Sequence, residues 1–338
     1  RLPELNKYIF RYLFCFLTKV KENRLDDIRP CIACHAGCLP VATFKGVGVE
    51  MDMGKGANNR YCAINSCTLA ERMYTPKPTT DPKHFAVIGG GIAGMEFALQ
   101  ADRRGHKVDL YEKTDKLGGV FIAAAMPSFK EKDKELIKWY ERQLAKSNVN
   151  VHMNTEIKDL SELNVDEIVV ATGSTAKKLP IPGGEKAIPA VDYLLNPECV
   201  GEKVLVIGGG LTGCEIAYEL AMNGKKPIVV EMQDDLVKVQ GVNMANSNYL
   251  RNAMDCYKVP VYLESSVKEI KDNYVIINTK DGEKTIEVDS VIASIGYNSY
   301  APLYKEKTKH LHVLGDAKTV GNLKTAIWGA NDLVITFK

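Results

Sequence analysis

Two stretches of the sequence decide the fold: Phe85-Ala-Val-Ile-Gly-Gly-Gly-Ile-Ala-Gly94 and Val204-Leu-Val-Ile-Gly-Gly-Gly-Leu-Thr-Gly213. Each begins with a run of apolar residues, which is typical of a buried parallel strand. Each then turns through glycines and continues into a helical pattern. This strand–turn–helix unit binds one nucleotide in many α/β proteins, and its repetition predicts two such units in one chain.

The first unit carries the spacing G-x-G-x-x-G in Gly89, Gly91 and Gly94. The first glycine allows the tight turn, the second lets the backbone approach a pyrophosphate, and the third lets the helix pack closely on the strand. The free N–H groups and dipole of the helix then attract the phosphates. Glu112 follows Gly89 by 23 residues and ends the next apolar strand, where a carboxylate can bind a ribose hydroxyl.

The second unit repeats this pattern in Gly208, Gly210, Gly213 and Glu231, and Glu231 again lies 23 residues after the first glycine. A single fingerprint could be a glycine-rich turn of another α/β protein. Here the strand, the helix, the second strand and the acid are all present, and all occur twice. The sequence therefore predicts an α/β fold with two Rossmann-like dinucleotide-binding domains.

The composition is typical of a globular protein large enough for two or three domains, with 338 residues and a formal net charge of +2. No basic stripe with interleaved aromatic residues is present, so we expect no nucleic-acid partner. The apolar stretch Tyr8–Val20 contains two cationic residues and is too short to span a bilayer, so we expect no membrane attachment. Because the first residue is Arg and not Met, we expect the chain to begin inside a longer gene product.

Nine cysteines, an odd number, argue against a disulfide framework and favour a reducing compartment, the cytoplasm. Cys31, Cys34 and Cys38 form C-x2-C-x3-C, and Cys62 follows after 23 further residues. Four thiolates match a [4Fe-4S] cluster, with one ligand for each iron. A tetrahedral zinc site is the alternative, although zinc sites more usually contain two C-x-x-C pairs. Cys67 is the rival of Cys62 for the fourth position.

Three shorter motifs extend the first unit: Lys116-Leu-Gly-Gly119, Ile168-Val-Val-Ala-Thr-Gly173 and Val313-Leu-Gly-Asp316. With the two fingerprints they resemble the two-dinucleotide-binding flavoproteins of glutathione reductase type, over residues 84–338. The resemblance implies that the first fingerprint binds FAD, together with Gly119, Thr172, Gly173 and Asp316, and that Asp316 lies near the flavin ribityl chain. It implies that the second fingerprint binds NADH or NADPH.

The acid of the second unit bears on the choice of nicotinamide cofactor. A carboxylate at Glu231 would bind a free 2′-hydroxyl and repel a 2′-phosphate, which favours NADH over NADPH. The residues that follow, Met232-Gln-Asp-Asp235, contain no arginine and add negative charge. We therefore expect no cation nearby that would neutralise Glu231.

The cysteine segment, Asp26-Asp-Ile-Arg-Pro-Cys-Ile-Ala-Cys-His-Ala-Gly-Cys-Leu39 followed by Cys62-Ala-Ile-Asn65, resembles the iron–sulfur segment of the 2,4-dienoyl-CoA reductase, 2-enoate reductase and trimethylamine dehydrogenase family. In that family an FMN-binding barrel of old yellow enzyme type precedes the cluster and the two nucleotide domains. The resemblance favours Cys62 as the fourth ligand. Residues 8–19 and 39–61 look like insertions relative to the family, and the barrel is outside this chain.

The two resemblances imply an iron–sulfur segment at 1–82, an FAD-binding domain at 83–198 and 299–338, and an NAD(P)H-binding domain at 199–298. The resemblance implies an electron-input module of an enzyme that reduces activated C=C bonds, with electrons passing from NADH to FAD, to [4Fe-4S] and to FMN on the barrel. Two alternatives remain: a stand-alone electron-transfer subunit that serves another protein, and a non-catalytic module that binds ADP. A homo-oligomer is compatible with all three, and no catalytic residue on the substrate side is predicted.

Overall fold

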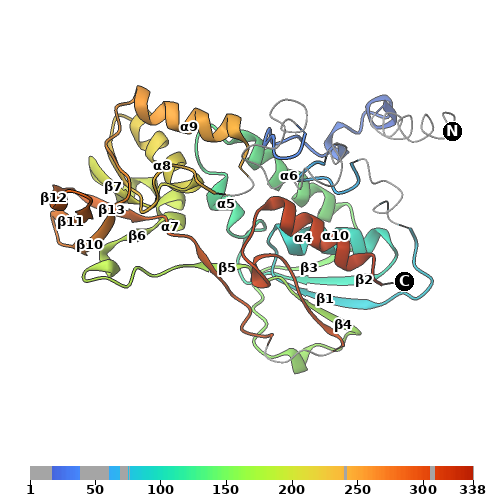
Figure 1. Ribbon diagram of the computed structural model, residues 1–338. Helices are drawn as coiled ribbons and strands as arrows, with labels where there is room; N and C mark the ends of the chain where they lie inside the picture. Colours follow the sequence, from blue (N-terminus) through green and yellow to red (C-terminus); the bar gives the residue numbers. More distant parts are fainter. Residues whose placement is uncertain are drawn as a thin grey trace, which may run out of the picture.

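The computed structural model describes residues 17–38, 61–68, 75, 77–239, 242–304 and 309–337. The two predicted insertions, at residues 8–19 and 39–61, lie almost entirely outside these ranges. Two five-stranded parallel sheets lie on opposite sides of the molecule (Figure 1). This arrangement confirms the predicted α/β fold with two Rossmann-like halves.

The first sheet contains the first fingerprint. Its strand order is β15 (Leu311–Val313), β4 (Glu167–Val170), β1 (His84–Ile88), β2 (Lys107–Tyr111) and β3 (Asn150–His152), and all neighbours are parallel. Its helices are α4 (Ile92–Arg103), α5 (Phe121–Ala124), α6 (Glu131–Ala145) and α10 (Leu323–Val334). Strand β15 comes from the end of the chain, so the first domain is built from two pieces of sequence.

The second sheet repeats the layout around the second fingerprint. Its order is β6 (Ile188–Pro189), β13 (Ser290–Ala293), β7 (Lys203–Ile207), β8 (Lys226–Val230) and β9 (Val261–Tyr262), again all parallel. Its helices are α7 (Ala190–Leu195), α8 (Leu211–Met222) and α9 (Met244–Cys256). An antiparallel sheet of β10 (Ser266–Ile270), β11 (Tyr274–Thr279) and β12 (Gly282–Glu287) packs against it through an apolar cluster.

A two-stranded antiparallel ladder of β5 (Ser174–Ala176) and β14 (Tyr297–Ser299) joins the halves, because the chain crosses there in both directions (Figure 1). Five short 3-10 helices complete the described elements: η1 (Leu25–Asp27), η3 (Leu160–Glu162), η4 (Gly184–Lys186), η5 (Pro197–Cys199) and η6 (Gly315–Ala317). Every helix in the described ranges is too short or too polar to traverse a lipid bilayer.

Each parallel sheet has its own apolar core. Phe85, Met95 and Leu110 are fully buried between the first sheet and its helices. Val206 and Ile216 are fully buried in the second. The two cores explain why the apolar runs in the sequence are continuous rather than alternating, since both faces of a parallel sheet are covered.

Candidate functional site

The first fingerprint forms a narrow turn between β1 and α4. Gly89 has φ +112°, a left-handed conformation that favours glycine, and a Cβ on Gly94 would collide with the Gly89 carbonyl oxygen. Gly91 begins α4 as its N-cap residue, and a Cβ at this position would meet nothing within 4 Å. The turn thus leaves open space at the N-terminus of a helix, as a bound pyrophosphate would require.

The carboxylate of Glu112 lies inside this turn. Its Oε2 atom accepts a hydrogen bond from the Gly90 N–H at 2.8 Å, and its Oε1 atom accepts one from the Thr114 N–H at 2.8 Å. Glu112 is 7% exposed, so it is fixed at the carboxyl end of β2. The predicted acid therefore lies next to the fingerprint glycines in space as well as in the sequence pattern.

The other predicted residues of the first site come together at the carboxyl ends of the same strands. A Cβ on Gly119 would lie 3.2 Å from the Cα atom of Gly91. Thr172 and Gly173 lie in the turn that follows β4, and Gly89 packs against this turn. Asp316 lies in η6, after β15, where its Oδ1 atom accepts a hydrogen bond from the Gly321 N–H at 3.0 Å.

The second fingerprint has nearly the same geometry. Gly208 has φ +98°, a Cβ on Gly213 would collide with the Gly208 carbonyl oxygen, and a Cβ on Gly210 would meet nothing within 4 Å. The Oε2 atom of Glu231 accepts a hydrogen bond from the Gly209 N–H at 2.6 Å. The Oε1 atom accepts another from the Gln233 N–H at 2.8 Å.

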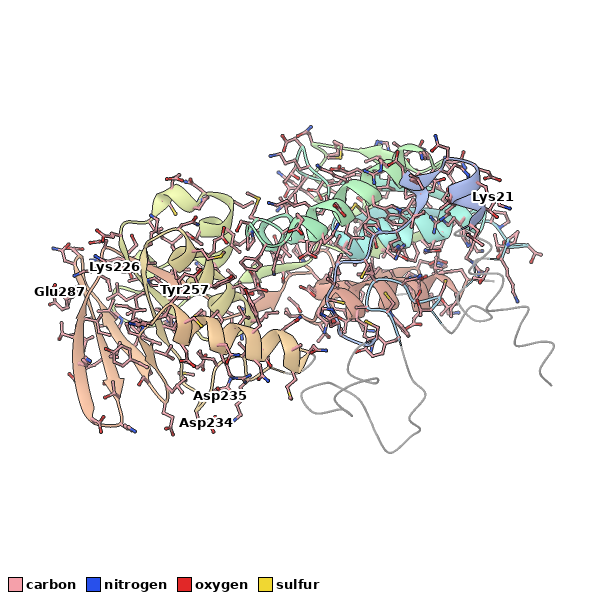
Figure 2. The ribbon with its side chains drawn as sticks, turned by 90° about the horizontal axis from the view of Figure 1, so that it is seen from above. Lys21, Lys226, Asp234, Asp235, Tyr257 and Glu287 are labelled. Atoms are coloured by element: carbon pink, nitrogen blue, oxygen red, sulfur yellow. The ribbon has the colours of Figure 1, made fainter. Side chains whose placement is uncertain are left out.

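The acids that follow Glu231 have partners of their own. Two cations lie in this loop, each on an acid that follows Glu231: Arg251 of α9 pairs with Asp235 at 2.9 Å, and Lys238 pairs with Asp234 at 2.6 Å. Figure 2 shows Asp234 and Asp235 at the outer edge of the second domain. Arg251 lies on α9, 16 residues after Asp235, so no local sequence pattern predicted this contact.

The cysteine segment is anchored to the first domain by buried contacts that the sequence did not predict. Arg29 pairs with Glu96 of α4 at 2.8 Å, and the two side chains are 13% and 1% exposed. The Arg29 guanidinium lies 4.3 Å from the ring centre of Trp139, a cation–π contact. Arg29 also donates to the carbonyl oxygen of Ile64, which ties the first cysteine stretch to the second.

The thiols of Cys31, Cys34, Cys38 and Cys62 lie close enough to influence one another. Burial, opposed by a hydrogen bond from the Ala36 N–H and assisted by the thiols of Cys62, Cys38 and Cys31, raises the pKa of the Cys34 thiol to about 11. Nevertheless, no three ligating side chains within the described ranges stand close enough together to bind a single metal ion. A [4Fe-4S] cluster takes one thiolate at each of four separate corners, so its ligands need not meet at one point.

Backbone N–H groups point at three of these sulfurs. The Ala33 N–H donates to Cys31 Sγ at 3.4 Å, and the Ala36 N–H donates to Cys34. At Cys62 the N–H of Ile64 acts on the sulfur, and the N–H of Asn65 is shared between the sulfur and the Cys62 carbonyl oxygen, which accepts it at 3.3 Å. Hydrogen bonds to sulfur are a typical means of tuning an iron–sulfur cluster, and the donor set therefore fits this group.

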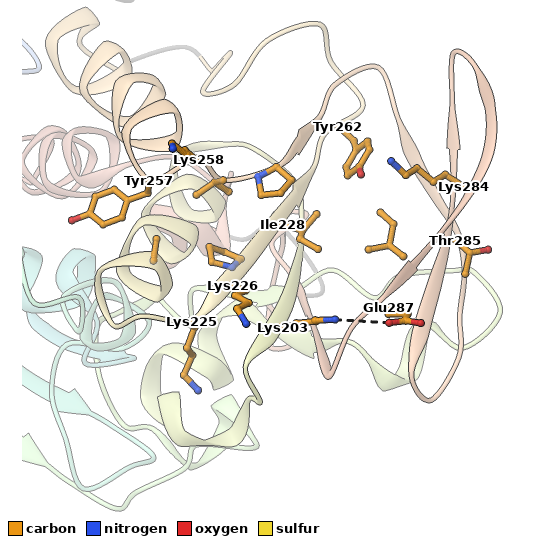
Figure 3. Close-up of a pocket in the computed structure, with 15 residues that line it drawn as sticks. Lys203, Lys225, Lys226, Ile228, Tyr257, Lys258, Tyr262, Lys284, Thr285 and Glu287 are labelled. Carbon is orange, nitrogen blue, oxygen red and sulfur yellow. Dashed lines mark ion pairs between the residues drawn. The ribbon is translucent and has the colours of Figure 1, made fainter.

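A cavity of about 580 Å³ opens on the second domain, away from both fingerprints (Figure 3). It lies at the amino ends of β7 and β8, whereas nucleotides bind at the carboxyl ends of such strands. Its lysines are largely engaged: Lys203 pairs with Glu287 at 3.8 Å, and Lys225 donates to the Val200 carbonyl oxygen at 2.8 Å. This cavity is therefore separate from the dinucleotide sites.

Residues 41–164 and 158–327 match the family model described as pyridine nucleotide-disulphide oxidoreductase. The chain belongs to this family. It is therefore an NAD(P)H-dependent flavin oxidoreductase, and its cofactors are FAD and a nicotinamide dinucleotide.

Two relatives extend the match through the cysteine segment. The chain is 36% identical over 322 residues to the cinnamate reductase of Clostridium sporogenes, covering 93% of this chain and 46% of that protein. It is 32% identical over 326 residues to the NADH oxidase of Thermoanaerobacter brockii, covering 91% of this chain and 48% of that protein. The chain thus spans about half the length of the curated relatives that it matches.

A solved structure of 2-naphthoyl-CoA reductase superposes with a TM-score of 0.84 and 28% identity, covering 95% of this chain and 48% of that chain. These similarities confirm the resemblance to the 2,4-dienoyl-CoA reductase, 2-enoate reductase and trimethylamine dehydrogenase family. The chain is a flavoprotein reductase module related to the enoate reductases of this family.

Proposed function

We propose that the chain is the electron-input module of an iron–sulfur flavoenzyme that reduces an activated C=C bond. In this proposal the nicotinamide donates hydride to FAD, and the [4Fe-4S] cluster carries single electrons onward to an FMN outside the chain. The protein contributes positioning, and the cofactors supply the chemistry. The observation that carries the proposal is the anchoring of a four-cysteine segment, through Arg29 and Glu96, directly to the helix of the first fingerprint.

We assign FAD to the first fingerprint. The open space at Gly91 would receive the pyrophosphate, and Glu112 is placed to bind the adenosine ribose. Asp316 would interact with the ribityl chain, with Gly119, Thr172 and Gly173 forming the walls. The segment after Gly119, which includes α5, contains no cysteine, so a redox disulfide beside the flavin does not fit this sequence.

We assign the nicotinamide dinucleotide to Gly208, Gly210, Gly213 and Glu231, with NADH as the preferred cofactor. Glu231 keeps its carboxylate at the strand end, where it would repel a 2′-phosphate. Arg251 of α9 is a candidate for binding such a phosphate, but it already pairs with Asp235. The free energy lost by breaking this ion pair would offset part of the favourable free energy that a contact between Arg251 and the 2′-phosphate could add to NADPH binding.

We propose that Cys31, Cys34, Cys38 and Cys62 hold the cluster, with the domain limits at about residues 83, 199 and 299. The thiol of Cys62 lies close enough to raise the pKa of the Cys34 thiol, as those of Cys38 and Cys31 do, and this supports Cys62 over Cys67 as the fourth ligand. The eight described cysteines are free thiols, which fits a reducing compartment, and we propose the cytoplasm.

The partner in this proposal is an FMN-binding barrel, because the relatives are about twice as long as the matched region. The names cinnamate reductase and 2-naphthoyl-CoA reductase refer to an unsaturated acid and an aromatic CoA ester, and we propose a substrate of that class. A barrel supplied as a separate protein would make the chain an electron-transfer subunit. Extraction of ADP in place of FAD would instead favour a structural module.

Anaerobic stopped-flow spectroscopy tests the electron entry. NADH should bleach the flavin faster than NADPH by roughly 30-fold at low cofactor concentration, equivalent to about 2 kcal/mol for a lost hydrogen bond and charge repulsion. Glu231→Ala should narrow the gap. Equal rates for the two cofactors, or a preference for NADPH, would contradict the role of Glu231 and point to Arg251.

A further inference from the structure

Two peptide groups beside the cysteine thiols are hydrogen-bonded at both ends. The peptide between His35 and Ala36 donates its N–H to the sulfur of Cys34. Its carbonyl oxygen accepts a hydrogen bond from the Nδ2 atom of Asn243 at 2.9 Å. One unbroken chain of hydrogen bonds therefore leads from an asparagine of the nicotinamide domain to a cysteine sulfur.

The peptide between Ile64 and Asn65 repeats the arrangement on the other side. Its N–H donates to the Cys62 carbonyl oxygen at 3.3 Å and also acts on the Cys62 sulfur, and its own carbonyl oxygen accepts a hydrogen bond from Arg29. The outer donor here is a cation held by Glu96 of the first domain. Each half of the molecule thus contributes one donor, and each donor reaches a different sulfur.

Both outer donors are held firmly. Asn243 is 1% exposed and is the N-cap residue of α9, where its Oδ1 atom accepts a hydrogen bond from the Ala245 N–H at 2.6 Å. Its amide is therefore used at both ends, and its Nδ2 group cannot turn away without losing the cap. A neighbouring residue of α9, Asn246, donates to the Cys34 carbonyl oxygen at 3.3 Å and holds the helix against the same loop.

A donor on a peptide oxygen strengthens the N–H donor of the same peptide, since hydrogen bonds in a chain polarise one another. A stronger N–H bond to a thiolate stabilises the more negative, reduced state of an iron–sulfur cluster and raises its reduction potential. The same chain of bonds would also orient the ligand, as groups outside the metal-binding residues commonly do.

We propose that Asn243 is a positioning residue of the nicotinamide domain that raises the reduction potential of the cluster through the His35–Ala36 peptide. Arg29 acts in the same way on Cys62 from the first domain. The inference rests on the proposed [4Fe-4S] cluster. It means that the domain that receives the electron donor also adjusts the acceptor, so that a displacement of α9 would make the cluster harder to reduce.

The test is an anaerobic redox titration followed by electron paramagnetic resonance, on the protein with its cofactors bound. Asn243→Ser keeps an oxygen for the helix cap and adds no charge, but its side chain is too short to reach the His35 carbonyl. At a fixed potential the ratio of reduced to oxidised cluster should fall about threefold. A tenfold change in this ratio corresponds to about 59 mV for one electron, so the reduction potential of the cluster should fall by nearly half of that value. Asn252→Ser, at an exposed position of the same helix, should leave the ratio unchanged.

Asn243→Asp is the second variant, because aspartate caps a helix as well as asparagine but cannot donate to the His35 carbonyl. Its potential should fall below that of the serine variant, since a negative charge is added. If the serine variant has the wild-type reduction potential and only the aspartate variant is shifted, the shift is due to the added charge alone. This result would overturn the inference. A wild-type protein without any cluster signal would instead overturn the proposed function.

Discussion

Glu96 and Glu215 occupy the same position in the two copies of the dinucleotide-binding unit. Each follows the glycine that begins its helix by five residues, from 91 to 96 and from 210 to 215. Both are largely buried, with side chains 1% and 14% exposed. Their partners differ: Glu96 pairs with Arg29 of the cysteine segment, whereas Glu215 pairs with Lys130 of the first domain at 2.7 Å.

The difference in partners reverses the direction of the pKa shift. Burial raises the pKa of Glu96, but Arg29 and hydrogen bonds from Asn331, Tyr140 and Gln100 outweigh burial, so the pKa is lowered. Burial also raises the pKa of Glu215, and its single described partner, Lys130, does not compensate. The same position thus holds a fully hydrogen-bonded carboxylate that fixes the cysteine segment in the first copy, Glu96. In the second copy, Glu215, it makes a weaker contact between the domains.

The largest expected effect separates the two fingerprints. Gly91→Val should abolish FAD binding, with an affinity loss of at least about a thousandfold, or about 4 kcal/mol, because the side chain would fill the pyrophosphate space. The fold should survive, since a Cβ at Gly91 meets nothing within 4 Å. Gly210→Val is the matched control: it should keep FAD and lose NADH, as flavin absorbance and NADH titration can show. Loss of FAD from Gly210→Val alone would mean that the two sites are reversed.

The next effect separates the two glutamates. Glu96→Gln leaves the Arg29 cation buried without a counter-charge and should lower the free energy of unfolding by about 3 kcal/mol. Glu215→Gln should cost less than about 1 kcal/mol, because Lys130 lies at a more accessible interface and can turn to water. Urea unfolding followed by circular dichroism measures both. Equal losses would show that the two anchors are equivalent despite their different partners.

The smallest effect concerns pH at the contact between the domains. Asp133 of α6 lies near Glu215, and burial raises its pKa to about 6. The folded state therefore keeps this proton longer than the unfolded chain, and stability falls as the pH rises from the ordinary carboxyl value to about 6. The Asp133→Asn variant should not lose stability in this way. Its free energy of unfolding, relative to that of the wild type, should therefore rise by about 1–2 kcal/mol between pH 4.5 and 7.5. An advantage that is constant across this range would contradict the shift.

The sequence predicted those parts of the site that depend on local spacing. The fingerprint glycines and the acids Glu112 and Glu231 come together because a strand, a turn, a helix and a second strand bring them to one sheet edge in every such unit. Each acid accepts a hydrogen bond from the second glycine of its Gly-Gly-Gly run, Gly90 or Gly209. This shared contact explains why both acids follow the first glycine by the same number of residues. The late strand β15 could also be predicted, because its motif resembled that of a known family.

The contacts that join the parts could not be predicted in this way. Arg29 and Glu96 are 67 residues apart, and Asn243 and His35 are 208 residues apart. No periodicity relates such pairs, since they depend on how separately folded units dock. For the same reason no motif in the sequence pointed to Glu96, although Gln100, Tyr140 and Asn331 all donate hydrogen bonds to its carboxylate.

We propose that the two nucleotide-binding units serve one iron–sulfur cluster. Quantification of flavin, iron, zinc and acid-labile sulfide in anaerobically purified protein tests it most directly. We expect one FAD with about four irons and about four sulfides for each chain, and loss of both iron and sulfide in Cys62→Ser but not in Cys256→Ser. Stoichiometric zinc without acid-labile sulfide would contradict it.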